Sequence, residues 1–233
     1  MYRFTDDLDL TTFFQFPRSI VTNGIWASLP SAARAVYPVY LMHMNRETGL
    51  SYPDERTVSA LAGVTEKTAR AGRNALDGAI PGLTVERYVT RRGRRSWRLK
   101  FAQQPSGRGS WRAFFTSVLH GGNWGNYKVC TPSAHALYPV LVMFSYYDHE
   151  AAMDDDDDVP EYGRHSFEYC EADYSVLREY SGLSRNGLFA ALDSLQRVFL
   201  VEQDDGNLWK VFRTPPSHYK RPYMNKLLTA RGL

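Results

Sequence analysis

The sequence predicts an α+β fold, mainly helical, in which two halves of similar pattern follow each other along the chain. Residues 54–101 carry two short helical patterns separated by a glycine and followed by two strand patterns. The same order returns in the second half of the chain. A length of 233 residues suits two domains of modest size, and a hydrophobic content of 43% is enough for packed cores.

The first half is organised around two helices joined by a tight turn. Apolar residues recur at helical spacing within residues 54–62, which predicts a helix with one buried face. Gly63 is expected to end this helix, because glycine adopts the positive φ of a tight turn without steric strain. Thr65 is then expected to cap a second helix over residues 66–77.

Ahead of this pair, a longer helix is expected over residues 31–44, with the Ser31 hydroxyl as its cap. Pro38 lies inside this segment. Because proline has no backbone N–H and its ring clashes with the preceding turn, Pro38 is expected to kink or divide the helix.

Positive charge gathers on the outer face of the second helix of the pair and on the hairpin that follows it. Strands are expected over residues 83–90 and 96–101, and the turn between them holds arginines around Gly93. Guanidinium groups bind phosphate in a bidentate manner, and arginine also enters narrow minor grooves. The alternative interpretation is a solvated turn and a surface helix that contacts proteins. The candidate nucleic-acid contacts in this half are Thr65, Lys67, Thr68, Arg70, Arg73, Arg91, Arg92, Arg94 and Arg95.

This stretch resembles the winged-helix family of DNA-binding domains, as found in bacterial regulators and in plasmid or phage replication proteins. The similarity rests on the Thr57-Val-Ser-Ala-Leu-Ala-Gly-Val run, on Thr68-Ala-Arg and on the basic hairpin, which corresponds to the wing. The resemblance implies that the helix over residues 66–77 lies in a major groove. It also implies that the wing contacts the adjacent backbone or minor groove.

An internal repeat relates the two halves. The corner Gly63-Val-Thr recurs as Gly182-Leu-Ser at an offset of 119, whereas earlier matches occur at an offset of 101. The change in offset indicates an 18-residue insertion at about residues 148–167. The residues matched at the offset of 101 are Phe13, Phe14, Gly24, Trp26, Ala33, Ala35, Tyr37, Pro38, Val39 and Met42, with Phe114, Phe115, Gly125, Tyr127, Ala134, Ala136, Tyr138, Pro139, Val140 and Met143.

The chain is therefore expected to form two tandem winged-helix domains, residues 1–104 and 105–213, followed by a basic tail over residues 214–233. Residues 1–104 carry 15 Lys and Arg against 9 Asp and Glu, a balance of +6. Residues 105–233 carry 13 against 16, a balance of −3. The first half is the better candidate for a polyanionic partner.

The second half departs from the basic pattern. Its hairpin turn is Asp204-Asp-Gly-Asn, which would repel phosphate. Arg185 and Asn186 begin the helix that corresponds to residues 66–77, and these side chains still suit base contacts. A second DNA-binding module and a module for homodimerisation or partner binding are both compatible with this half.

Five consecutive aspartates, Asp154 to Asp158, lie within the insertion. A solvated loop is the expected role of such a run. The alternative is that it competes with DNA for a basic surface or recruits a basic partner.

The sequence gives little sign of catalysis or of a bound cofactor. The six histidines show no HxH or HExxH spacing, and no Walker-type glycine loop is present. No enzyme activity, cofactor or metal site is therefore expected. Cys130 and Cys170 form no CxxC pair, so no disulfide framework is expected.

Membrane insertion is not expected either, because no apolar run reaches the roughly 18 residues of a membrane span. The N-terminus carries acidic residues where a signal peptide needs a basic start. A cytoplasmic, nucleoid-associated location is expected.

Together these features predict a sequence-specific binder of double-stranded DNA. The resemblance implies an initiator of plasmid or mobile-element replication, which would recruit host replication proteins. A transcriptional regulator such as a repressor, with transcription proteins as partners, and a winged-helix scaffold for protein contacts are the alternatives.

Overall fold

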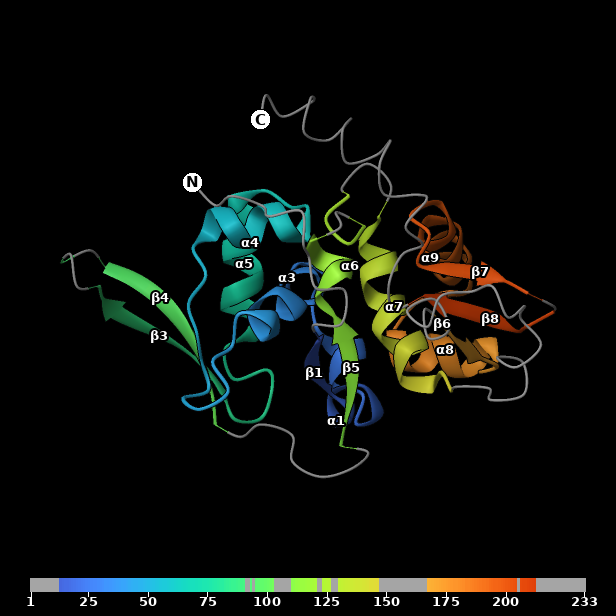
Figure 1. The fold of residues 1–233 in the computed structure, drawn as a ribbon, viewed down its shortest axis with the longest axis horizontal. Coiled ribbons are helices and arrows are strands. Elements are labelled where there is room, and N and C mark those ends of the chain that lie inside the picture. The colour runs from blue at the N-terminus through green and yellow to red at the C-terminus, as the bar shows by residue number, and fades with distance from the viewer. Residues whose placement is uncertain are drawn as a thin grey trace, which may run out of the picture.

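A computed structural model describes residues 13–90, 93, 95–102, 110–120, 123–126, 130–146, 167–204 and 206–212. Two small three-stranded sheets lie at opposite ends of the molecule, and helices occupy the space between them (Figure 1). A third sheet of two strands, β1 and β5, lies near the centre. All pairings between these strands are antiparallel. The predicted α+β class with a large helical share is confirmed.

The elements follow the same general order in the two halves. The first half comprises β1 (Phe13–Pro17), α1 (Arg18–Thr22), α2 (Ile25–Ser28), α3 (Ser31–Met42), β2 (Leu50–Ser51), α4 (Glu55–Ala62), α5 (Glu66–Leu76), β3 (Leu83–Val89) and β4 (Arg95–Phe101). The second comprises β5 (Trp111–Phe115), α6 (Thr116–His120), α7 (Pro132–Phe144), β6 (Phe167–Cys170), α8 (Tyr174–Ser181), α9 (Arg185–Arg197), β7 (Val201–Gln203) and β8 (Trp209–Phe212). The sheets are ordered β2-β4-β3 and β6-β8-β7.

The helix pair α4 and α5 forms where the sequence predicts it. Gly63 caps α4 with φ of +65°, and a Cβ at this position would collide with the backbone carbonyl of Gly125. The Thr65 hydroxyl caps α5 by accepting a hydrogen bond from the Thr68 N–H at 3.1 Å. Conformation and close packing therefore both require glycine at the corner.

Helix α3 differs from expectation at its cap, and the prolines of α3 and α7 lie inside continuous helices. Pro30, which has no side-chain bond, is the cap of α3, and Ser31 is its first helical residue. The predicted Ser31 cap is therefore wrong. Pro38 does not divide α3, and Pro139 does not divide α7. Both helices are largely buried, so packing in the core stabilises them despite the proline.

The sequence did not indicate the third strand of either outer sheet. β2 pairs through Leu50 and Ser51 with β4, and a segment this short shows no periodicity. β6 pairs with β8, and its first residue, Phe167, lies at the predicted end of the insertion. The insertion up to residue 166 with its aspartates, residues 103–109 and the tail over residues 214–233 lie outside the described residues.

The central strands show that the two halves correspond differently from the prediction. β1 starts at residue 13 and β5 at residue 111, and α1 starts at residue 18 and α6 at residue 116, a difference of 98 in both cases. The predicted offset of 101 does not describe the starts of these elements. Ala35 in α3 and Ala136 in α7, whose numbers differ by 101, each accept a hydrogen bond from a tryptophan.

Two tryptophans tie the halves together by reciprocal hydrogen bonds. The indole N–H of Trp26 donates to the Ala136 carbonyl in α7 at 2.7 Å. The indole N–H of Trp124 donates to the Ala35 carbonyl in α3 at 2.9 Å. Both side chains are fully buried. Tyr127, the predicted counterpart of Trp26, lies outside the described residues, and Trp124 makes the matching bond.

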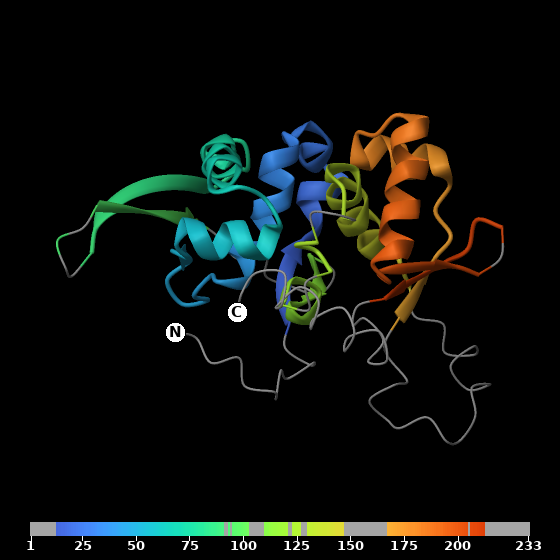
Figure 2. The same ribbon diagram turned by 90° about the horizontal axis from the view of Figure 1, so that it is seen from above.

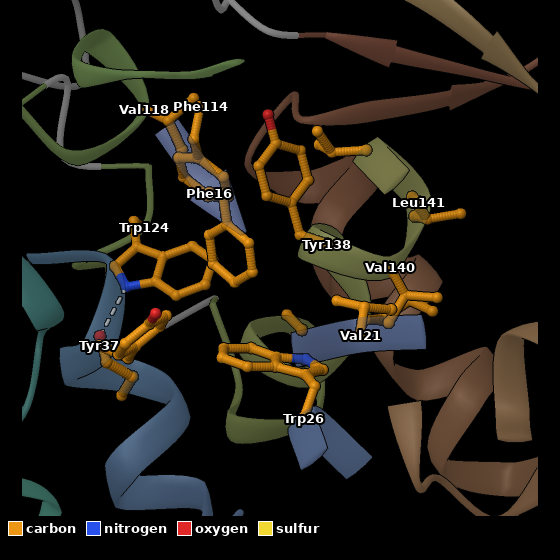
Figure 3. Close-up of a cluster of buried hydrophobic side chains, with 14 of the residues drawn as sticks. Phe16, Val21, Trp26, Tyr37, Phe114, Val118, Trp124, Tyr138, Val140 and Leu141 are labelled. Atoms are coloured by element: carbon orange, nitrogen blue, oxygen red, sulfur yellow. Dashed lines mark hydrogen bonds between the residues drawn. The ribbon is translucent and has the colours of Figure 1, made fainter. Parts of the chain in front are cut away.

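Aromatic rings from both halves surround these indoles (Figure 3). The Phe16 ring lies 5.4 Å from Trp26, and the Phe114 ring lies 5.8 Å from Trp124, both edge to face. Phe16 and Phe114 stack on each other at 5.7 Å. Buried residues of the two halves form one continuous cluster, so the described part of the chain has a single core.

Replacement of Trp26 or Trp124 by phenylalanine is expected to lower the free energy of unfolding by about 2–3 kcal/mol. Each change removes a buried hydrogen bond between an indole and a carbonyl and opens a small cavity. Urea unfolding followed by circular dichroism measures the effect. Trp111→Phe is the matched control, because Trp111 is half-buried and stacks on Phe13 at the sheet margin. An equal decrease in the free energy of unfolding for all three variants would contradict the proposed importance of the reciprocal hydrogen bonds.

His135 is fully inside this core and packs on Trp124, with the ring centroids 4.4 Å apart. Burial lowers the pKa of His135 from 6.5 to about 4, although a hydrogen bond with the Trp124 carbonyl opposes the shift. The unfolded chain therefore binds a proton more readily than the folded one between these values.

The free energy of unfolding is expected to fall as pH decreases from 6.5 to about 4, by about 2–3 kcal/mol from this residue. His135→Asn should flatten that part of the pH profile. Urea unfolding at several pH values measures it, with His43→Asn at the end of α3 as the control for loss of a histidine. A profile unchanged in His135→Asn would refute the assignment.

Both cysteines are buried free thiols. Burial raises the pKa of Cys130 to about 12 and that of Cys170 to about 11. They are packing residues of the core and are protonated at neutral pH.

Candidate nucleic-acid interface

The outer face of α5 is polar and partly basic. Thr65, Lys67 and Arg70 are exposed, and Thr68 is half-buried. Thr65 and Thr68 also share a hydrogen bond between their hydroxyls at 2.9 Å. Four of the five candidate residues of this helix region are therefore at least partly accessible to solvent.

Arg73, the fifth candidate, is buried, with only 2% of the residue exposed. Its Nη1 donates to Glu55 Oε1 at 2.6 Å, and its Nε and Nη2 donate to the Asn74 side-chain oxygen. The interpretation of Arg73 as a direct contact to bases or phosphates is therefore corrected. A spacing of eighteen residues between Glu55 and Arg73 gives no local signal of this pairing.

Arg73 also connects α5 to the hairpin through Trp97. Its guanidinium carbon lies 4.5 Å from the centroid of the Trp97 ring. The guanidinium carbon of Arg87 lies 4.6 Å from the same ring, and Arg87 pairs with Trp97 across β3 and β4. Cation–π attraction between Arg73 and Trp97 therefore joins α5 to the hairpin, and the ion pair of Arg73 with Glu55 joins α5 to α4.

The hairpin of β3 and β4 reaches away from the body of the molecule (Figure 2). Arg87, Arg95 and Lys100 are exposed along it. Arg98 forms an ion pair with Glu86 on the adjacent strand at 2.9 Å. Arg91, Arg92 and Arg94 at the turn lie outside the described residues, whereas Gly93 has φ of +73°, as a tight turn requires. The described strands are therefore basic up to the turn.

Glu55 is the site residue that sequence reasoning missed. It is the first residue of α4, and its carboxylate accepts hydrogen bonds from Arg70 Nε at 3.2 Å and Nη2 at 2.8 Å, in addition to Arg73. The hydrogen bond from Arg70 is the main cause that lowers the pKa of Glu55. An acidic residue at a helix start is common, so only its partners reveal its role.

In the second half, Arg185 and Asn186 are exposed at the start of α9. The Ser184 hydroxyl caps that helix by accepting from the Gly187 N–H at 3.1 Å. Phe189, the fifth residue of α9 as Arg70 is of α5, is 42% exposed. Its ring lies 5.4 Å from Tyr174, the first residue of α8. An aromatic pair thus stands where the first half has Arg70 and Glu55.

The second hairpin, β7 and β8, is acidic where the first is basic. Glu202 and Asp204 are exposed, and Asp204 forms an ion pair with Lys210 at 3.1 Å. Asp205 lies outside the described residues. This end of the molecule therefore presents a different electrostatic surface from the β3–β4 end.

The described ranges contain no group of three or more His, Cys, Asp and Glu side chains that could hold a metal ion. Among the helices of these ranges, none has the length and apolar composition needed to cross a membrane.

Comparison with known protein families, with curated proteins and with solved structures found no match to this chain.

Glu55→Gln is expected to lower the free energy of unfolding by about 2–3 kcal/mol, because Arg73 would keep its charge in a buried place without a carboxylate. Glu55 itself is 24% exposed, which keeps the cost below that of a fully buried pair. Glu66→Gln is the matched control, since Glu66 is exposed in the first turn of α5. Chemical unfolding measures both variants.

Arg73→Leu should reduce the cost of Glu55→Gln, because the buried charge is then absent. Leu192, the eighth residue of α9, fills the corresponding place in the second half. If Glu55→Gln lowers the free energy of unfolding by the same amount with and without Arg73, the ion pair with Arg73 is not the source of the stabilisation by Glu55.

Proposed function

We propose that this protein binds double-stranded DNA in a sequence-specific manner, through α5 and the β3–β4 hairpin acting as a winged helix. The observation that carries this proposal is the fixed placement of an exposed polar and basic helix face beside a projecting basic hairpin. Arg73, Trp97 and Arg87 maintain that placement. Neither feature alone would distinguish a DNA-binding surface from an ordinary soluble one.

The dimensions and chemistry of α5 suit a major groove. A helix with its side chains is about 10–12 Å across, and the major groove of B-DNA is about 12 Å wide. Thr65, Lys67 and Thr68 lie in the N-terminal turn, which is the part of a recognition helix that contacts base edges. Arg70 follows one turn later and suits a guanine, whose O6 and N7 accept a bidentate guanidinium.

The hairpin would contact the backbone or the adjacent minor groove. Arg87, Arg95 and Lys100 supply charge on the described strands. Arg91, Arg92 and Arg94 would add charge at the turn. Release of counterions by such contacts makes binding strongly dependent on salt.

We assign the second half the same winged-helix architecture and a shared origin by duplication. Its element order and sheet order support this assignment. Arg185 and Asn186 would allow it to read bases as well. The exposed Phe189 and the acidic β7–β8 hairpin favour contact with protein, including a second copy of the chain, over phosphate binding.

For the biological role we propose initiation of plasmid or mobile-element replication, in the cytoplasm and at the nucleoid, with host replication proteins as partners. A transcriptional repressor would use the same interface. Genomic position separates the two proposals, because an initiator gene is expected beside direct repeats and a repressor gene beside an inverted repeat that overlaps a promoter.

Lys67→Ala combined with Arg95→Ala is expected to weaken duplex binding and to reduce the slope of log affinity against log salt by about 1–2. Fluorescence anisotropy with a labelled duplex, obtained by selection from a random library, measures both quantities. Replacing Arg91, Arg92, Arg94 and Arg95 together by alanine should reduce the slope further.

Arg178→Ala combined with Arg197→Ala is the matched control, since both arginines are exposed in the second half and the change in charge is the same. This control should leave affinity and slope nearly unchanged. If the two double variants behave alike, or if selection from the random library yields no preferred duplex, the proposed function is wrong.

A further inference from the structure

We infer that Glu55 is a specificity-determining positioning residue, which acts by orienting Arg70 toward one base and by restraining it from phosphate. The inference rests on the proposed function, because it assumes that α5 faces DNA. It identifies which position of α5 supplies most of the sequence preference.

The Arg70 side chain is accessible to solvent, and hydrogen bonds to Glu55 restrain it. Its side chain is 58% exposed, and its Nε and Nη2 both donate to the Glu55 carboxylate. An exposed arginine normally samples many rotamers, and ordering it on binding costs side-chain entropy. The Glu55 contact restricts this freedom before DNA arrives, so less entropy is lost when a base is bound.

The hydrogen bonds to Glu55 leave the end of the exposed Arg70 guanidinium group available for another acceptor. A guanidinium has five N–H donors in one plane. Nε and one N–H of Nη2 donate to Glu55, whereas Nη1 and the second N–H of Nη2 form the adjacent edge at the end of the group. That edge matches the O6 and N7 acceptors of guanine, so the geometry favours a bidentate contact with a single base.

Glu55 itself is fixed in turn by the buried Arg73. The carboxylate uses Oε1 for Arg73 at 2.6 Å and Oε2 chiefly for Arg70 at 2.8 Å. Glu55 therefore connects the buried Arg73 to the exposed Arg70, the side chain proposed to contact a base. The carboxylate also neutralises one of the two cations, which weakens attraction of Arg70 to phosphate at unrelated sequences.

The second half lacks this arrangement. Tyr174 and Phe189 occupy the places of Glu55 and Arg70, and Leu192 occupies that of Arg73. The three positions that are charged in the first half are therefore uncharged in the second half. The sequence preference of the whole protein is therefore expected to come mainly from the first half.

The test compares Arg73→Leu with Arg73→Leu combined with Glu55→Gln. With Arg73 absent, Glu55 is no longer needed to neutralise a buried charge, so a loss of specificity must act through Arg70. The selected duplex is changed at each base pair in turn, and affinity is measured against a scrambled duplex. We expect Glu55→Gln to reduce discrimination at one base pair by about 10-fold, with equal or tighter binding to the scrambled duplex.

Arg70→Lys in the otherwise native chain is the second arm, because it leaves the Glu55–Arg73 pair in place. It should remove discrimination at the same base pair, and adding Glu55→Gln to it should cause no further loss. Glu66→Gln, which removes a nearby charge without a hydrogen bond to Arg70, should leave discrimination unchanged.

The outcomes separate the two proposals. Unchanged discrimination after Glu55→Gln, or loss at a base pair different from the one that depends on Arg70, would refute the role of Glu55 while specific binding persists. Absence of any preferred duplex for the native chain would instead overturn the proposed function.

Discussion

The structure depends on the need of two buried indole N–H groups for hydrogen-bond acceptors. A buried donor without a partner lowers the net stability of a domain, so the carbonyls that these two indoles contact stabilise the fold. Trp26 finds it in α7 and Trp124 finds it in α3, which are the central helices of opposite halves. Neither half provides the acceptor for its own tryptophan. Because α4 and α5 pack on one side of this junction and α8 and α9 on the other, the two helix pairs are fixed relative to each other (Figure 1).

A second constraint acts within the first half, where the buried guanidinium of Arg73 needs both charge and hydrogen bonds. Glu55 supplies them from α4, and Trp97 covers the remaining surface from β4. One buried cation therefore fixes two helices and a hairpin that are separate in the sequence. Arg70 shares the same carboxylate and so becomes part of this rigid unit while it stays accessible. A surface organised before binding loses less conformational entropy when it meets its partner.

How much of this the sequence predicted depends on the range of each interaction. α4, the glycine corner and α5 were predicted well, because caps, turn residues and helical periodicity are local signals. β1, β2 and β5 were missed, since their partners lie far along the chain and the segments are too short for a periodic pattern. Arg73 was placed on the outer face because its spacing from Arg70 resembles an exposed stripe, and its carboxylate partner precedes it by eighteen residues. The proline-containing segments of α3 and α7 suggested a repeat at an offset of 101, whereas the difference of 98 between the starts of β1 and β5 is seen only in the structure.

That pairing also has a consequence for synthesis of the chain. β1 leaves the ribosome before β5, with Phe14 and Phe16 among its residues, and this hydrogen-bonding partner is made about a hundred residues later. Until then the strand has an unsatisfied apolar edge, the kind of surface that promotes association between nascent chains. Contacts of such long range also slow the search for the native state. The order of the elements thus delays completion of the central sheet until β5 has been made, and it places an aggregation hazard at β1 during that interval.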